Sequence, residues 1–230
     1  MDNNIKLNKI ITTIIREFLN EKYSKNNLEA INDFYPEYYN NSNNDTEIVG
    51  WSSKKEQNER FKVLLNIGVE NGETILDYGC GLGALYEYMT NHYDDFGYIG
   101  VDINQDFINK CKQKYPKATF KKIEDITDIK SKYDWFIASG AFTVYTPMKD
   151  MTKTINDAFK KVKYGIAINF LDNKYAKNSD LAAIRGYDKM KIYELFLEEF
   201  KEFHTVELHD DYMKNDFTIY IKKKKYFDLT

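Results

Sequence analysis

The stretch ILDYGCGLG, residues 75–83, places a carboxylate and three glycines at the end of an apolar run. Glycines in a turn between a strand and a helix leave backbone N–H groups open to a ligand, because no side chains cover them. The glycines fit the G-x-G-x-x-A pattern of dinucleotide-binding proteins, and Asp102 follows at the distance where those proteins place a ribose-binding acid. The turn therefore predicts a site for a nucleotide-like ligand.

Three further features separate this site from a dinucleotide site. Asp77 stands two residues before the first glycine, where its charge suits a cationic or amine-bearing ligand and repels a pyrophosphate. The chain ends with two consecutive strand-like segments instead of a second βαβαβ half. About 70 residues precede the turn, whereas dinucleotide folds usually begin with it. These features favour a cationic ligand and leave an NAD-linked oxidoreductase as an alternative.

The elements that must position this turn alternate between strands and helices. An S-x-x-E capping box at Ser53 and Glu56 predicts a helix that ends near Gly68. Apolar runs and helical periodicity predict the elements that follow: strands 74–78, 98–103, 118–123, 133–140 and 164–171, and helices 82–93, 104–115, 151–162 and 190–200. Such alternation predicts an α/β fold whose parallel sheet is covered by helices on both faces.

The two ends of the chain depart from this alternation. Residues 203–212 and 215–225 read as strands too close together for a crossover helix, so they predict an antiparallel pair at the sheet edge. Helical spacing before residue 51 predicts two more helices, at 5–19 and 26–39. We interpret residues 1–50 as an N-terminal helical extension or lid. These helices could instead seal one face of the sheet.

Composition limits the classes of function. The 230 residues are 43% hydrophobic and 30% charged, which is typical of a globular protein. A formal net charge of -3 gives no general attraction to nucleic acids. Two cysteines cannot build a disulfide framework or a zinc cluster, and we expect no metal site. No signal-peptide pattern and no run of about 18 apolar residues stands out, so we expect a cytoplasmic protein away from the membrane.

In chain order, ILDYGCGLG, YIGVDIN, FKKIEDI and YDWFIASG resemble the successive motifs of class I S-adenosylmethionine (SAM)-dependent methyltransferases. The resemblance covers roughly residues 50–225 and implies that residues 51–230 form a methyltransferase domain. It also implies a Rossmann-like seven-stranded sheet of order 3-2-1-4-5-7-6 with the last strand antiparallel, SAM as cofactor and S-adenosylhomocysteine (SAH) as product. The stretches VGWSSKKEQNERF and HDDYMKNDFTIYI are similar to a group of small bacterial and phage methyltransferases of unassigned substrate.

The resemblance implies a role for each residue that occupies a motif position. Asp77 and the backbone of Gly79 and Gly81 would face the methionine part of SAM, with Asp77 near its ammonium. Asp102 would accept hydrogen bonds from both ribose hydroxyls, and Ile103 would pack on the adenine. These positions follow predicted strands at their carboxyl ends, where open α/β sheets bind ligands.

The adenine end would be held by the segment after the third predicted strand. Asp125 would accept a hydrogen bond from the adenine amino group, and the Ile126 N–H could serve a ring nitrogen. Glu124 could take the role of Asp125. Asp125 could instead cap a short helix at 127–130, because EDIT is a favourable capping sequence.

Four other residues complete the expected cofactor site. Ser139, at the end of the fourth predicted strand, would lie beside the methyl group. Cys80, inside the turn, is expected to pack as a small residue rather than act as a nucleophile. Trp51 could cover SAM or anchor its helix to the core. Arg60 could pair with the SAM carboxylate or remain a solvated residue on a charged face.

The methyl acceptor leaves few marks in a sequence, because methyl transfer needs mainly alignment and the removal of a proton. The chain lacks the Asp/Asn-Pro-Pro-aromatic stretch of amino-methylating DNA enzymes and the Pro-Cys pair of cytosine-C5 enzymes. We therefore expect transfer to an oxygen or nitrogen of a small-molecule or sugar-type acceptor, by a monomer or homodimer. The alternatives are a nucleic-acid or protein substrate and a SAM-binding protein without catalysis.

Two residues are candidates for a catalytic role. Tyr145, after the fourth predicted strand, could orient an acceptor, and His209 could act as a base because histidine titrates near neutrality. His209 could equally belong to a polar surface turn. The long connection after the fifth strand is typical of a binding loop. The residues expected to bind the acceptor lie there and in the N-terminal helices: Arg185, Tyr187, Tyr35 and Tyr39.

Overall fold

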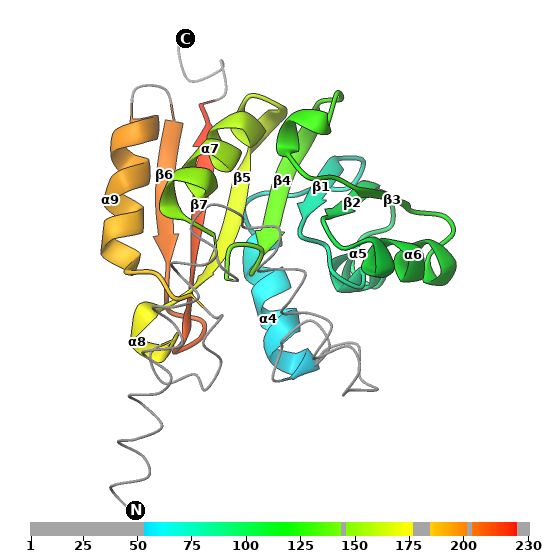
Figure 1. Ribbon diagram of the computed structural model, residues 1–230, viewed down its shortest axis with the longest axis horizontal. Coiled ribbons are helices and arrows are strands. Elements are labelled where there is room, and N and C mark those ends of the chain that lie inside the picture. The colour runs from blue at the N-terminus through cyan, green and yellow to red at the C-terminus, as the bar shows by residue number, and fades with distance from the viewer. Residues whose placement is uncertain (1–52, 144–145, 177–184, 202–203, 225–230) are drawn as a thin grey trace, which may run out of the picture.

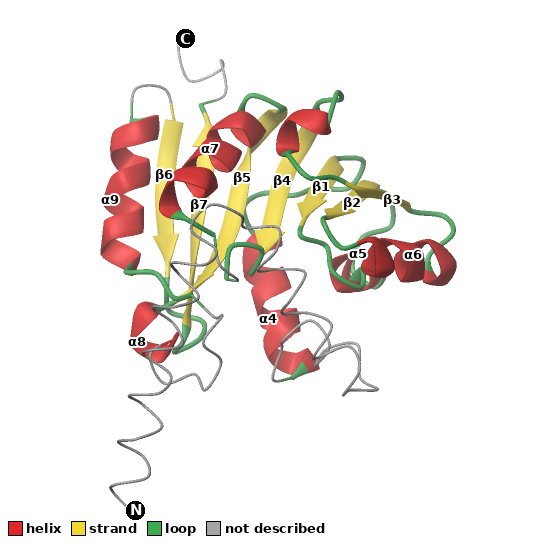
Figure 2. Ribbon diagram, in the orientation of Figure 1, coloured by secondary structure: helices red, strands yellow, loops and turns green. Residues whose placement is uncertain are grey.

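The computed structural model describes residues 53–143, 146–176, 185–201 and 204–224. The helices predicted before residue 51, and their role as a lid, lie outside these ranges. Seven strands form one sheet of order β3-β2-β1-β4-β5-β7-β6, with helices on both of its faces (Figure 1, Figure 2). β7 is antiparallel to both of its neighbours and the other strand pairs are parallel, which confirms the predicted Rossmann-like topology.

Apart from a short helix at 173–176 that the sequence did not predict, the described elements agree with the predicted ones to within three residues at each end. The strands are β1 (Thr74–Tyr78), β2 (Gly97–Asp102), β3 (Thr119–Lys122), β4 (Tyr133–Ser139), β5 (Val162–Leu171), β6 (His204–His209) and β7 (Asp216–Lys223). The helices are α4 (Lys54–Leu65), α5 (Ala84–Thr90), α6 (Gln105–Lys114), α7 (Met148–Phe159), α8 (Asn173–Ala176) and α9 (Lys189–Phe200), with a single 3-10 turn, η1 (Ile126–Asp128), between β3 and β4. The start of α7 was predicted three residues too late. Pro147 precedes this helix, and its φ of -56° already suits a helix start.

Each face of the sheet carries its own apolar core, because successive strand residues point to opposite faces. In β4, Phe136 packs toward α7 and α9, whereas Trp135 and Ile137 pack toward α4, α5 and α6. Met151 of α7 and Phe196 of α9 are fully buried on the first face. The carboxyl ends of the parallel strands therefore open between two helix layers, where loops from both faces meet.

α4 brings polar as well as apolar side chains to the sheet. Ser53 caps the helix by accepting the Glu56 N–H on its Oγ at 3.2 Å, as the sequence predicts. Gln57, Arg60 and Phe61 are all buried on the inner face of the helix. Two of these three side chains are polar, so the layer between α4 and the sheet must supply polar partners.

One such partner comes from the last strand. Arg60 forms a buried ion pair with Asp216, and the two side chains are only 3% and 2% exposed. Because β7 is antiparallel, its first residue lies beside Leu171 at the carboxyl end of β5. Nearby, Asn169 donates a hydrogen bond to the Tyr212 hydroxyl oxygen at 2.7 Å. Polar contacts thus connect α4 to the edge of the sheet where the strands end.

Candidate active site

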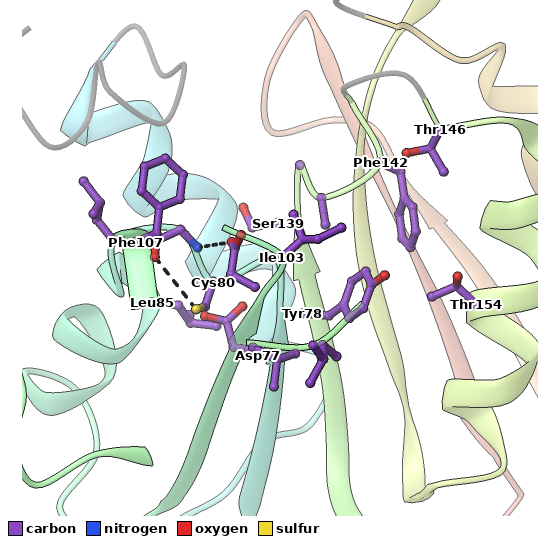
Figure 3. A pocket seen from close by; sticks show the side chains of 18 of the residues that line it. Asp77, Tyr78, Cys80, Leu85, Ile103, Phe107, Ser139, Phe142, Thr146 and Thr154 are labelled. Carbon is purple, nitrogen blue, oxygen red and sulfur yellow. Dashed lines mark hydrogen bonds between the residues drawn. The ribbon is translucent and has the colours of Figure 1, made fainter. Parts of the chain in front are cut away.

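A cavity of about 440 Å³ opens at the carboxyl ends of the strands, between the turn after β1 and the loops after β2, β3 and β4 (Figure 3). In this view Asp77 and Cys80 lie to the left, and Tyr78, Phe142 and Thr154 lie to the right. Most of the described residues that the sequence assigns to the cofactor line the cavity: Asp77, Gly79, Cys80, Gly81, Asp102, Ile103, Glu124, Asp125 and Ser139. The fold therefore brings together residues that are spread over more than 60 positions of the chain.

The turn after β1 requires its glycines. Gly79, Gly81 and Gly83 adopt φ values of 73°, 52° and 78°, in the left-handed region that other residues rarely adopt. A Cβ on Gly79 would lie 2.7 Å from the Ala141 Cβ, and a Cβ on Gly83 would lie 2.9 Å from the Tyr115 ring. The turn thus passes close to its neighbours and presents backbone, not side chains, to the cavity.

Asp102 links this turn to the end of β2. Its Oδ2 accepts the Gly81 N–H and its Oδ1 accepts the Asn104 N–H, both at 2.9 Å. Burial raises the pKa of Asp102, while these backbone N–H groups oppose the rise. The carboxylate is therefore held at the mouth of the turn with lone pairs left for further donors.

Asp77 is the most deeply buried carboxylate of the cavity wall, with 2% of the residue exposed. The Tyr98 hydroxyl donates a hydrogen bond of 2.5 Å to its Oδ2. Burial raises the pKa of Asp77 to about 7, the Tyr98 bond lowers it, and the Asp102 charge raises it further. No ion pair joins Asp77 to a cation among the described residues. The site therefore carries a carboxylate that a cationic ligand would stabilise in its charged form.

In the segment after β3, Asp125 takes the capping role considered for it and also pairs with a lysine. Its Oδ1 accepts the Thr127 N–H at 2.8 Å and so caps η1, and its Oδ2 pairs with Lys153 of α7 at 3.1 Å. The backbone N–H of Thr127 is the main cause that lowers the pKa of Asp125 to about 2. Glu124 also lines the cavity, and the Ile126 side chain is buried in the core of the α7 face.

Cys80 lies in the floor of the turn. Its side chain is buried, and a Cβ added to Gly100 of β2 would lie only 3.0 Å from the Cys80 sulfur. Burial raises the pKa of the Cys80 thiol well above its usual range, which keeps the sulfur protonated. These properties suit a packing residue and disfavour a nucleophile.

Several residues assigned to the site from sequence do not line the cavity. Arg60 is neither at the cavity wall nor solvated, because it pairs with Asp216 beneath α4; the expected alternative of an exposed arginine is wrong. Its helix neighbours Gln57 and Phe61 line the cavity in its place. Four further residues lie outside the described part of the chain: Trp51, Tyr145, Tyr35 and Tyr39.

His209 lies at the end of β6, the edge strand, and two strands separate it from β4. Its ring packs against Tyr220 with centroids 4.2 Å apart, and its Nε2 is 3.5 Å from a Glu207 oxygen. Its side chain does not line the described cavity. This placement gives His209 no direct path to the reacting atoms in the described structure.

Arg185 and Tyr187 support the loop after β4. The Arg185 backbone N–H donates to the Thr143 carbonyl at 2.6 Å, and its Nη1 donates to the Thr146 carbonyl at 3.1 Å. The buried Tyr187 hydroxyl donates to the Phe142 carbonyl at 2.7 Å. Since Phe142 and Thr146 line the cavity, the two side chains shape its wall from behind.

This arrangement predicts that Tyr187→Phe lowers the free energy of unfolding by about 1–2 kcal/mol, because the buried Phe142 carbonyl loses its donor. Urea unfolding at pH 7 measures the change. Tyr193→Phe, at a half-buried tyrosine within α9, is the matched control and should change stability little. Equal stability of Tyr187→Phe and the unaltered protein would show that the hydroxyl does not support the loop.

The sequence assigned no role to several described residues of the cavity wall, among them Phe61, Phe142, Thr146 and Lys153. Gln57 and Phe61 are four positions apart on a helix, and this spacing was the available signal for a shared face. The others carry no motif. Within the described residues, no group of three His, Cys, Asp or Glu side chains could hold a metal ion, and no helix is long and apolar enough to cross a bilayer.

Comparison with known proteins agrees with the fold and the turn. Residues 75–165 match the family described as a methyltransferase domain. Over 73 residues the chain is 34% identical to protein 235L of Invertebrate iridescent virus 6, a candidate methyltransferase. That match covers 31% of this chain and 27% of the viral protein, so the chain spans about a quarter of the length of this relative.

Solved structures resemble the chain over most of its length. A magnesium protoporphyrin IX methyltransferase from Synechocystis PCC 6803 with bound SAM aligns with a TM-score of 0.58 at 12% identity, covering 91% of this chain and 97% of that one. A plantazolicin methyltransferase in complex with a triazolic analogue and SAH aligns with a TM-score of 0.62 at 14% identity, covering 98% and 100%. At these identities the likeness establishes the fold.

Proposed function

We propose, from the premise that this chain is a class I SAM-dependent methyltransferase, that it transfers the methyl group of SAM to an oxygen or nitrogen atom of a small molecule and releases SAH. The observation that carries the proposal is the cavity at the strand ends, where the glycine turn, Asp77 and Asp102 meet. A backbone-lined turn flanked by two carboxylates suits a ligand with a positive charge and sugar hydroxyls.

The residues present fit SAM part by part. Asp102 has free lone pairs for the ribose hydroxyls, and Ile103 beside it offers an apolar surface for the adenine. Asp77 offers a buried negative charge to the ammonium of the methionine part. Asp125, or Glu124 next to it, would accept a hydrogen bond from the adenine amino group. The glycine backbone between them leaves room for the chain that carries the sulfonium.

Bound SAM would supply an electrophilic methyl group on a sulfonium, so the chain needs to align an acceptor in line with it. The wall around Ser139 and Phe142 lies at the end of β4, beside the turn. Phe61 and Phe142 would limit water around the reacting atoms. Arg185 and Tyr187, by holding the loop after β4, would position this wall without touching the acceptor.

Two observations support a small-molecule acceptor. The net charge of -3 offers no general attraction to a nucleic acid. The two similar structures are named for acceptors of limited size, magnesium protoporphyrin IX and plantazolicin. Analysis of the methylated product would identify the acceptor atom as oxygen or nitrogen.

Titration calorimetry with SAM, SAH and NAD tests the proposed function. The proposal expects micromolar binding of SAM and SAH and no binding of NAD, because Asp77 would repel a pyrophosphate. Binding of NAD alone would overturn it. Incubation with SAM and candidate acceptors, with SAH release as the readout, would then separate an enzyme from a protein that binds SAM without catalysis.

Asp102→Ala should weaken SAM binding by roughly 2–3 kcal/mol, because it removes the acceptor of both ribose hydroxyls. Asp102→Asn keeps one oxygen and should lose less. Asp106→Asn, an exposed acid in the first turn of α6, is the control and should bind SAM normally. Unchanged SAM affinity in Asp102→Ala would remove Asp102 from the cofactor site.

A further inference from the structure

Two polar atoms of the cavity wall are buried without a hydrogen-bond partner in the described structure: the Gln57 Oε1 and the Ser139 Oγ. Gln57 is only 2% exposed, so its side chain is shielded from bulk solvent. An unpaired buried acceptor costs free energy, and proteins rarely keep one without a reason. Both atoms lie where a ligand in the cavity could satisfy them.

Gln57, Ser139 and Asp77 belong to one side of the sheet. Ile75 and Ile137 point into the core beneath α4, and strand alternation turns the residues two positions later, Asp77 and Ser139, to the same side. β1 and β4 are adjacent strands, and both residues line the cavity shown in Figure 3. Gln57 lies on the buried face of α4, the helix that packs on this side of the sheet.

The chemistry of the three groups selects a ligand. They offer a carboxylate, an amide carbonyl and a hydroxyl, and all three can accept hydrogen bonds. A ligand carboxylate or phosphate would be repelled by Asp77, and a neutral apolar group would leave Gln57 and Ser139 unpaired. A primary ammonium carries one positive charge and three N–H donors, which matches one carboxylate and two neutral acceptors.

We infer that Gln57 is a specificity-determining residue of the cofactor site: with Ser139 and Asp77, it binds the α-ammonium of the methionine part of SAM. The inference rests on the proposed function and adds α4 to the cofactor site. The Arg60–Asp216 ion pair lies about one helical turn further along α4. It anchors the helix to the sheet and so positions Gln57. Gln57 is thus held by its helix rather than by hydrogen bonds of its own Oε1.

Titration calorimetry with two probes tests the inference. SAH carries the ammonium, whereas 5′-methylthioadenosine keeps the adenosine and the thioether but lacks the amino-acid end. Gln57→Leu should weaken SAH roughly ten- to a hundredfold, the loss expected for one hydrogen bond to a charged group, and should leave 5′-methylthioadenosine within twofold. Gln57→Glu retains an acceptor and should bind SAH at least as tightly as the unaltered protein at pH 8.

Two controls separate recognition from support of the fold. Glu59→Gln, on the exposed side of the same helix, should change neither affinity. The melting temperature of ligand-free Gln57→Leu should not fall, because the substitution removes an unpaired buried oxygen. Unchanged SAH affinity in Gln57→Leu, or equal losses for both probes, would overturn the inference while the proposed function stands. An unaltered protein that binds neither SAM nor SAH would overturn both.

Discussion

Asp77→Asn should stabilise the ligand-free protein at pH 8 and weaken SAH binding about a hundredfold. The first effect follows from burial, which raises the pKa of this carboxyl from 3.8 to about 7. Above pH 7 the folded protein must hold a charged group that the unfolded chain would hold more easily in water. The neutral amide removes this cost of up to roughly 4 kcal/mol while it can still accept the Tyr98 hydrogen bond.

The sign of the pH dependence follows from proton linkage. Between pH 3.8 and about 7 the folded state holds more protons on Asp77 than the unfolded state, so its contribution to stability falls as the pH rises. The unaltered protein and Asp77→Asn should therefore differ little near pH 4 and most above pH 7. Ligand binding runs the other way, because a bound ammonium favours the charged carboxylate. Below pH 7, the affinity for SAH should therefore decrease by up to tenfold for each unit by which the pH is lowered.

Urea unfolding and calorimetry with SAH, both at pH 5, 6, 7 and 8, measure the two effects. Asp77→Asn should give a flatter affinity profile than the unaltered protein. Asp106→Asn, which removes an exposed carboxylate, should leave both profiles in place. A variant that is less stable at pH 8, or that keeps full SAH affinity there, would contradict the assignment of Asp77 as a buried anion kept for a cation.

Arg60→Met should lower the free energy of unfolding by about 3–5 kcal/mol, because it leaves the Asp216 carboxylate buried without its partner. Burial already raises the pKa of Asp216, and the Arg60 charge opposes this rise. The guanidinium therefore keeps the carboxylate charged in a layer where only 2% of the Asp216 side chain reaches solvent. Without the cation, nothing offsets the free-energy cost of desolvating the Asp216 carboxylate.

A double variant separates this electrostatic cost from lost packing. Arg60→Met with Asp216→Leu removes both charges and should recover most of the stability that Arg60→Met loses, because apolar pairs often replace buried ion pairs at little cost. Urea unfolding of the two single variants and the double variant completes the cycle. Equal stability of the double variant and Arg60→Met would show that packing, not the unpaired charge, causes the loss.

The parts of the site that could be predicted from sequence are those whose physical cause is local. The glycines of the turn are needed for a left-handed backbone within five residues, and Asp102 follows one strand later. The parallel sheet follows from the alternating elements, and its antiparallel edge follows from the crossover-free pair at the end. Such features are written in adjacent residues and need no knowledge of distant contacts.

The remaining parts depend on contacts that no local pattern encodes. Arg60 was expected to pair with the cofactor or to stay solvated, but its partner Asp216 lies on a strand at the far end of the chain. Arg185 and Tyr187 were expected to bind the acceptor because their connection is long, yet their donors point at backbone carbonyls of the loop after β4. Asp125 has a local capping partner, Thr127, as one alternative anticipated, and it pairs with Lys153 of α7 as well.

The pairing of α4 with β7 also has a consequence in time. Arg60 and Asp216 are 156 residues apart, and the Tyr220 hydroxyl that donates to the Val63 carbonyl reaches across 157. At the usual pace of protein synthesis, roughly 10–30 s pass between the translation of these partners. A ribosome therefore releases the glycine turn long before the anchors of α4 exist. The part of the cavity wall that Gln57 contributes can form only after the last strand has been made. We therefore expect the protein to bind its cofactor only near the end of synthesis.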